Sequence, residues 1–292
     1  MSDSEQVSVS PKKSAGAACR CLGRLVSRTG RYASSCLTIF GKELRSYLMT
    51  PFGWVILACV MGLQGFSLNA ALKIVKDAPQ RDGLMFIMMS LPVFWFYFLF
   101  IFPLITMRTF AEEERMGTLE TLLTAPVTTG QVVLGKFASA LVFYMVLWVP
   151  LMLYPWMSGL ANALTEFQYG YLPSATLEYR MADWMGTYLI LFLLGAWFIS
   201  LGILCSSLTR SQIIAGIVTI GVLISYFFLG LVPMLWGEFP AASIFHYMSC
   251  KEQLDAFTNG LVDTRPVVLY LTLTVLTLAL TVRIVDYRRW RR

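Results

Sequence analysis

The sequence predicts an all-α integral membrane protein with six transmembrane helices. Of its 292 residues, 57% are hydrophobic and only 14% are charged. A soluble domain carries about 25% charged residues, so this chain has too little charge to cover a water-facing surface. The composition therefore excludes a soluble enzyme and a disordered chain. Six long uncharged stretches, and the concentration of Lys and Arg in alternate connecting segments, complete the prediction.

Each uncharged stretch is long enough, or nearly so, to cross a bilayer, because about 20 apolar residues at 1.5 Å per residue span the hydrocarbon core. The last stretch is the shortest, but it continues beyond Arg283, whose head group can extend to the interface at a helix end. The predicted spans are residues 53–72, 84–107, 137–165, 184–209, 211–237 and 266–282.

The distribution of basic residues predicts the orientation. With a cytoplasmic N-terminus, 17 Lys and Arg residues lie inside and six lie outside, as the positive-inside rule expects. Both termini are then cytoplasmic. The net charge of +6 therefore reflects the membrane topology and does not indicate that the protein binds nucleic acid. Cys250 is the one outward-facing thiol, so no disulfide is expected across the outer face. With a single His in the chain, no metal site is expected.

The segment before the first span divides into two parts. Residues 1–35 are polar and basic, without an apolar signal sequence, and we expect a flexible cytoplasmic tail near anionic lipid. Residues 36–50 predict an amphipathic helix in the membrane interface, broken at Thr50-Pro51. This helix serves either as a plain surface anchor or as a docking element. Its candidate contact residues are Phe40, Lys42, Glu43, Leu44 and Arg45. The six-span domain then covers residues 51–287, and residues 288–292 form a basic cytoplasmic end.

The connection between the second and third spans, residues 108–131, predicts a short amphipathic helix. Three consecutive acids, residues 112–114, suit the positive end of a helix, and Pro126 ends it. Thr128 and Gln131 form a plausible capping box for the third span. The apolar positions with helical spacing are Met116, Leu119, Leu122 and Leu123. A solvated hairpin is the alternative, but exposed leucines on so short a loop favour a partner that packs on them.

Several patterns bear on catalysis and energy supply. Residues 130–136 match G-x-x-x-x-G-K of a phosphate-binding loop, but Phe137 stands where Ser or Thr would bind Mg²⁺. No span carries an ionisable residue in its middle. This argues against an ion-coupled carrier and against a membrane-bound enzyme, both of which use such groups. Energy must therefore come from a separate chain.

The uncharged polar residues, glycines and prolines of the spans predict how the helices pack. Polar residues within spans favour hydrogen bonds between helices, small residues favour close approach, and prolines favour kinks. An apolar, aromatic run at residues 239–248 is compatible with half-helices that cap a cavity. The polar residues include Gln64, Ser200 and Thr219, the glycines are Gly62, Gly65, Gly195, Gly202, Gly216 and Gly221, and the prolines are Pro92, Pro103, Pro150 and Pro155.

Residues 111–136, AEEERMGTLETLLTAPVTTGQVVLGK, resemble the signature of ABC-2 type permeases, in particular the gliding-motility-associated permease subfamily. That pattern is A-E-E-x-x-x-G-T-L-E-x-L-L-x-x-P-V with a following V-L-G-K. The similarity extends to KELRSY at residues 42–47, TPFGW at residues 50–54 and RRWR at residues 288–291.

The resemblance implies a type V exporter-like half-transporter with six spans, an N-terminal connecting helix, and short outer helices between the last two spans. It also implies a cytoplasmic coupling helix that contacts an ATPase subunit. The implied contact residues are Arg108, Glu112, Glu113, Glu114, Arg115, Gly117, Thr118, Leu119, Glu120, Leu122 and Leu123.

The implied function is that of a permease subunit of an ABC transporter, an exporter, in the bacterial cytoplasmic membrane. A separate ATPase, expected in two copies, binds ATP and Mg²⁺, so no cofactor is expected in this chain. Further expected partners are a second permease, identical or related, a protein with a large extracytoplasmic domain, and membrane lipid. The alternative is a mechanotransmission or assembly subunit that passes ATPase motion to outer partners without moving a substrate.

Overall fold

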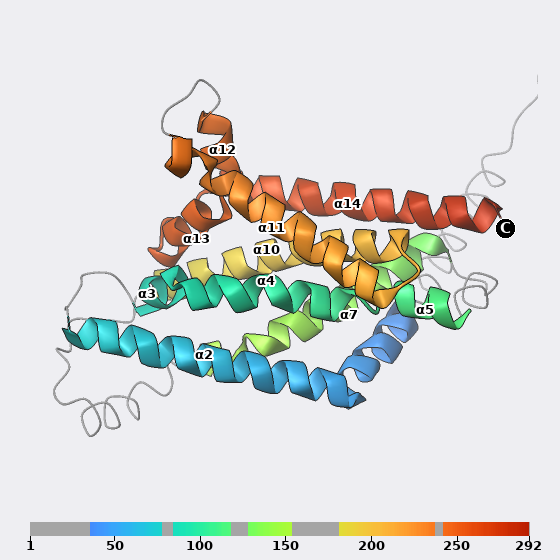
Figure 1. Cartoon of the computed structure of the whole chain (residues 1–292), viewed down its shortest axis with the longest axis horizontal. Helices are drawn as coiled ribbons and strands as arrows, with labels where there is room; N and C mark the ends of the chain where they lie inside the picture. The colour runs from blue at the N-terminus through green and yellow to red at the C-terminus, as the bar shows by residue number, and fades with distance from the viewer. Residues whose placement is uncertain (1–35, 78–83, 118–127, 154–180, 237–241, 292) are drawn as a thin grey trace, which may run out of the picture.

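A computed structural model describes residues 36–77, 84–117, 128–153, 181–236 and 242–291, and all regular structure in these ranges is helical (Figure 1). Residues 36–49 form a first helix, here called the N-terminal helix. The others are α2 (Pro51–Asp77), α3 (Leu84–Ser90), α4 (Pro92–Thr106), α5 (Ala111–Met116), α7 (Thr129–Leu147), α8 (Val149–Leu153), α10 (Met181–Leu208), α11 (Gln212–Trp236), α12 (Ala242–Met248), α13 (Cys250–Thr258) and α14 (Thr264–Arg291).

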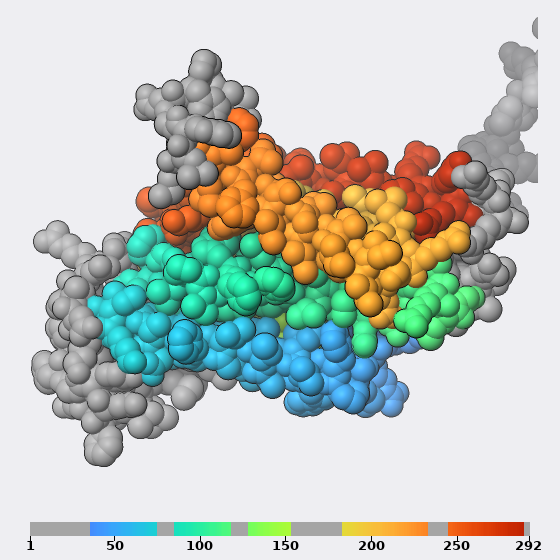
Figure 2. Space-filling view, viewed as in Figure 1, coloured from blue at the N-terminus to red at the C-terminus, as the bar shows by residue number. Residues whose placement is uncertain are grey.

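The six-span prediction is confirmed. Six candidate spans lie on α2, α4, α7, α10, α11 and α14, each apolar and long enough to cross a membrane. Most of the α10 span is buried inside the bundle, whereas at most 28% of the span residues of α2, α11 and α14 are buried. Helices α2, α4 and α11 lie side by side on one face (Figure 2). The chain is thus a bundle built around α10, with apolar outer surfaces that suit lipid.

Aromatic side chains fill the space between α4, α7 and α10. The ring of Phe102 lies 5.1 Å from that of Phe198 and 5.2 Å from that of Tyr144, and Trp148 lies 6.0 Å from Tyr144. All four side chains are buried. These contacts hold the three helices together, and they leave this part of the bundle closed.

Small and mildly polar residues bring particular helices together. Gln64 Nε2 of α2 donates to the carbonyl oxygen of Leu147 at 3.0 Å, and the hydroxyls of Ser200 and Thr277 join α10 to α14 at 2.6 Å. Gly195 and Gly202 lie where an added Cβ would clash with Tyr144 and Thr106, respectively. By contrast, Gly62, Gly65 and Gly221 have nothing within 4 Å of that position, so the close-packing prediction holds only for part of the set.

The predicted start of the third span at Phe137 is wrong, because helix α7 begins eight residues earlier. The capping box that we predicted at Thr128 and Gln131 is present and starts this helix. Lys136, which we treated as a boundary because it is charged, lies inside α7 and is buried. A charge marks the end of a span only when it must reach water, and the side chain of Lys136 has partners within the protein.

Pro92 and Pro150 lie at breaks between consecutive helices, whereas Pro103 lies within one helix. Pro92 starts α4 after a break at Leu91, so the second predicted span begins with a separate short helix, α3. Pro103 lies inside α4, and Pro150 lies in α8 beyond the end of α7 at Trp148. Pro155 lies outside the described residues.

The predicted short helices between the last two spans are confirmed as α12 and α13. Helix α13 packs against α3 and α10, and Gly186 of α10 lets the backbone of Phe257 approach closely. Tyr226 of α11 donates to the carbonyl oxygen of Met248 at 2.8 Å. Cys250, at the start of α13, is buried, and burial raises the pKa of its thiol to about 12. That thiol is therefore protected from ordinary thiolate chemistry.

Candidate functional site

The ends of five elements meet at one end of the bundle, here called the charged end. It comprises the N-terminal helix, residues 107–117 with α5, the first turns of α7, the α10–α11 link at residues 209–211, and the last turns of α14. In Figure 1 these segments lie opposite α3, α12 and α13. The predicted coupling and connecting helices are thus neighbours in space.

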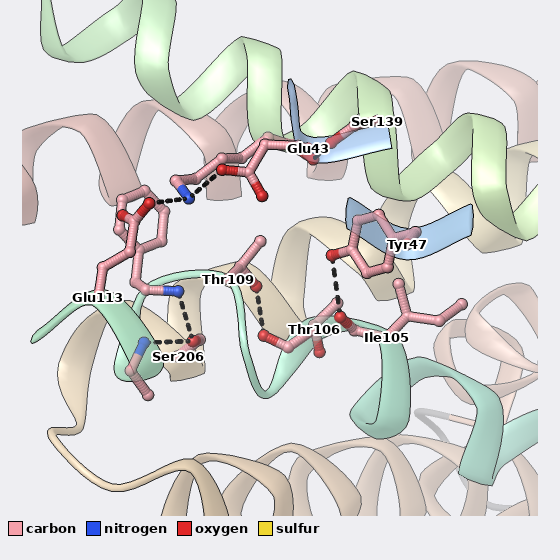
Figure 3. Close-up of polar contacts among 11 residues, drawn as sticks. Glu43, Tyr47, Ile105, Thr106, Thr109, Glu113, Ser139 and Ser206 are labelled. Carbon is pink, nitrogen blue, oxygen red and sulfur yellow. Dashed lines mark hydrogen bonds and ion pairs between the residues drawn. The ribbon is translucent and has the colours of Figure 1, made fainter. Parts of the chain in front are cut away.

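Lys136 joins three elements at the charged end. Its Nζ lies 2.9 Å from Glu43 Oε1 of the N-terminal helix and 2.8 Å from Glu113 Oε1 of α5 (Figure 3). The lysine side chain is 1% exposed, and the two carboxylate side chains are 16% and 14% exposed. A buried cation needs such partners, because leaving it unpaired would cost several kcal/mol.

The N-terminal helix is also attached to α4 and α7. The hydroxyl of Tyr47 donates to the carbonyl oxygen of Ile105 at 3.1 Å (Figure 3), and the Tyr47 ring stacks on Phe143 at 5.1 Å. Burial, assisted by the charge of Glu43, raises the pKa of Tyr47, so this hydroxyl stays a neutral donor. Gly135 lets α7 approach Ile39 closely.

A hydroxyl from α10 holds the start of α5. The backbone N–H groups of Phe110 and Ala111 both donate to Ser206 Oγ at 3.2 Å (Figure 3). Groups at the first turn of a helix have no partner within the helix. Ser206 therefore supplies an acceptor at the buried start of α5 and fixes this start against α10.

Glu114, the third acid of α5, is shared by two arginines. Its Oε1 lies 3.2 Å from Arg210 Nε in the α10–α11 link, and its Oε2 pairs with Arg288 Nη1 of α14. Arg288 Nη2 also donates to the carbonyl oxygen of Leu208 at 3.0 Å. The Glu114 side chain is only 5% exposed, so α5 is tied to the ends of α10, α11 and α14 from within.

A polar cavity of about 360 Å³ opens between the N-terminal helix, α2 and α5. Arg108 lines it, with Nε 3.9 Å from Glu112 Oε2 and its guanidinium 4.1 Å from the centroid of the Phe52 ring. The other lining residues include Lys42, Glu43, Tyr47, Glu113 and Lys136. Within the described ranges, no group of three His, Cys, Asp or Glu residues is arranged to hold a metal ion.

A family profile described as ABC-2 family transporter protein matches residues 37–284, which is most of the chain. The chain belongs to the ABC-2 family of transporter membrane proteins. A comparison with curated proteins gives no match. The protein is therefore an ABC-2 transporter permease subunit, a multi-pass membrane protein of a family that does not contain the ATPase.

In this ABC-2 permease, the predicted coupling segment is interrupted. We expected one helix from the three acids through Leu123, but α5 ends at Met116, and Gly117 has φ 71° in the left-handed region. A residue in this conformation stops an α-helix, and glycine adopts it at no steric cost. Gly117 thus ends the acidic helix. Thr118, Leu119, Glu120, Leu122 and Leu123 lie outside the described residues.

Some side chains of α5 pair with residues of the permease, and others are exposed. Glu113 and Glu114 bind cations within the permease, and Glu112 lies beside Arg108. Arg115 and Met116 are exposed, and Met116 reaches 62%. On this helix, Glu113 and Glu114 therefore face the bundle, and the most exposed side chains lie in its last turn.

The helical prediction for residues 36–50 is confirmed for residues 36–49, and Ile39, Leu44 and Tyr47 of this helix pack against the bundle. Glu43 pairs with Lys136, whereas Leu37 is 65% exposed and Leu48 is 40% exposed. Among the predicted contact residues, Phe40 and Leu44 are half-buried, and Lys42 and Arg45 are exposed.

Sequence reasoning missed four residues of the site. They are Lys136, Ser206, Arg210 and Arg288. One signal for Lys136 was present, because a helix that starts at the capping box of Thr128 must carry residue 136 two turns inside it. The others pair with partners roughly 95 or more residues away in the chain, a distance over which periodicity gives no information.

Proposed function

We propose that this ABC-2 permease is one half of an ATP-driven exporter, similar to the gliding-motility-associated subfamily, in a bacterial cytoplasmic membrane. Its charged end faces the cytoplasm, and a separate ATPase subunit binds there. One observation carries the proposal: the largely buried carboxylates of Glu113 and Glu114 hold α5 through ion pairs with α7, the α10–α11 link and α14. Through Lys136 it is also linked to the N-terminal helix.

The ion pairs give α5 the properties of a force-transmitting element. A six-residue helix has too few internal hydrogen bonds to be stable alone, so its position follows the groups that hold it. An ATPase that pushes on the exposed Arg115 and Met116 would move Glu113 and Glu114 with the same rigid turn. These carboxylates would then shift α7 and α14 relative to each other, which is a shear or hinge motion of packed helices.

The filled aromatic core supports a pathway between two permeases. Phe102, Tyr144 and Phe198 close the space between α4, α7 and α10, so a substrate path through this part of one chain would require the core to unpack. Two permeases and two ATPase subunits, with ATP and Mg²⁺ held by the ATPases, form the proposed transporter. The type V exporter-like architecture implied by the sequence supports the outward direction.

The same closed core favours a second candidate function. A mechanotransmission subunit needs no substrate path and would pass motion along the helices to an outer partner. Helices α12 and α13 and the turn after them would provide the contact, because Leu261 and Val262 are 69% and 52% exposed there. Cross-linking from Leu261 to an extracytoplasmic protein, without transport by reconstituted vesicles, would favour this candidate over the exporter.

The coupling role is tested on the exposed turn of α5. We expect Arg115→Glu together with Met116→Asp to reduce co-purification of the ATPase at least about tenfold, and to reduce ATP hydrolysis in the complex. Leu261→Asp, at the opposite end and with similar exposure, is the matched control. Both variants should keep the wild-type melting temperature. Equal ATPase recovery from the α5 variant and the control would overturn the assignment of this surface.

A further inference from the structure

A second cavity lies at the charged end, and its lining combines arginines with apolar side chains. It measures about 810 Å³ and lies beside the last turns of α14 and the α10–α11 link. Its lining residues are Glu114, Leu208, Arg210, Leu280, Arg283, Ile284, Tyr287 and Arg288. Five of them, from Leu280 to Arg288, follow one another at helical spacing on α14, so one stripe of this helix forms the wall.

The charged part of this cavity has an excess of cations. Three arginines line it, against one carboxylate, Glu114, which already pairs with Arg210 and Arg288. Arg283 is exposed and has no ion pair with any described residue. Guanidinium groups bind phosphate through paired hydrogen bonds. The cavity therefore has the chemistry of a site for a phosphate-bearing ligand.

The rest of the cavity wall is apolar and accessible. Leu208 is 54% exposed and Leu280 is 47% exposed. Leu280 precedes Arg283 and Arg288 on α14 and lies within the apolar part of this span, whereas Arg288 lies near its end. Charge at the helix end, followed by apolar surface toward the middle of the span, matches the polarity of a phospholipid at a membrane interface.

We propose that this cavity binds the headgroup of an anionic phospholipid, with its phosphate near Arg210 and Arg283 and its acyl chains along Leu208 and Leu280. A soluble acidic protein segment would satisfy the arginines but would leave the apolar wall uncovered. A lipid satisfies both. This proposal does not rest on the coupling role of α5, and it assigns a lipid of the leaflet nearest the charged end as a bound component of the permease.

The experiment uses native mass spectrometry of the full-length permease in detergent micelles. These contain equal amounts of phosphatidylglycerol and phosphatidylcholine with the same acyl chains. We expect the wild type to retain phosphatidylglycerol preferentially, and Arg283→Gln to reduce that preference about fivefold, since each arginine near anionic lipid contributes a factor of this order. Arg265→Gln is the matched control. It lies on the same helix, at its other end, with a side chain 78% exposed, and should keep the preference.

Four outcomes would overturn the proposal. One is a wild type without preference, and another is an equal loss in the Arg283 and Arg265 variants. The third is displacement of the lipid by free glycerol phosphate at matched concentration, which would make the cavity a free phosphate site without an acyl-chain contribution. If Arg283→Gln instead lowers ATPase recovery and leaves lipid preference unchanged, the surface belongs to the ATPase, and the lipid proposal is wrong.

Discussion

Lys136 is the residue on which the charged end depends most. Its ammonium lies between Glu43 and Glu113 and 5.3 Å from the centroid of the Phe110 ring. Taking a cation out of water costs several kcal/mol, and its attraction to nearby carboxylates offsets this cost only when the pairing is complete. The lysine and its two acids therefore form one unit, in which the loss of any member leaves the others poorly compensated.

We predict that Lys136→Met destabilises the permease by about 3–5 kcal/mol, the cost of breaking a buried ion pair. The apolar side chain fits the helix, but it leaves two nearby carboxylates facing each other. The measurement is thermal unfolding of the purified protein in detergent, followed by intrinsic tryptophan fluorescence. The melting temperature of the single variant should fall clearly below that of the wild type.

The control for this prediction is the triple variant Lys136→Met, Glu43→Gln, Glu113→Gln. Replacing the whole charged unit removes the repulsion between the acids, so most of the lost stability should return. A triple variant no more stable than the single one would mean that the destabilisation comes from packing alone. The structural role assigned to this ion cluster would then be wrong.

At the scale of elements, the contact between α10 and α4 depends on a glycine. An added Cβ at Gly202 would lie 2.2 Å from Thr106 Oγ1 and 2.8 Å from its Cβ. The buried Thr106 is further fixed by donating to the carbonyl oxygen of Phe102 at 2.8 Å. The two helices therefore approach closely at this point, as small residues permit in membrane bundles.

We predict that Gly202→Ala destabilises the permease by about 1–3 kcal/mol through overpacking, measured as a lower melting temperature in detergent. Gly221→Ala on α11 is the control, because nothing lies within 4 Å of its added Cβ. The control should be neutral or slightly stabilising, since alanine favours a helix over glycine by up to about 1 kcal/mol. Equal destabilisation of both variants would contradict the close contact.

The elements differ in how far the sequence could predict them. Spans follow from hydropathy alone, because every peptide group in lipid must be paired within a helix, and the capping box at Thr128 is a local signal. The sequence does not predict which face of a buried helix packs against which neighbour. Helix α10 is apolar on all sides, so its sequence could not tell which glycine meets Thr106. The same holds for the buried ion pairs of α5, which join residues distant in the chain.

At the scale of the whole molecule, the two ends hold their elements together by different means. At the charged end, the buried side chains of Lys136 and Glu114 form ion pairs with neighbouring elements. At the opposite end, the Arg265–Asp263 ion pair is exposed, and hydrogen bonds from Tyr226 and Tyr270 hold α12 and α13. Exposed pairs contribute little to stability. Ion pairs therefore contribute more to holding the elements of the charged end than those of the opposite end.

The orientation of the permease can be tested directly with one cysteine at each end. Met116→Cys, at the charged end, and Leu261→Cys, at the opposite end, replace side chains that are 62% and 69% exposed. The excess of basic residues on the segments of the charged end predicts that it is cytoplasmic. A membrane-impermeant maleimide added to intact cells should label Leu261→Cys above the wild-type background, and should label Met116→Cys only after permeabilisation. The reverse pattern would invert the topology, and with it the side from which an ATPase reaches α5.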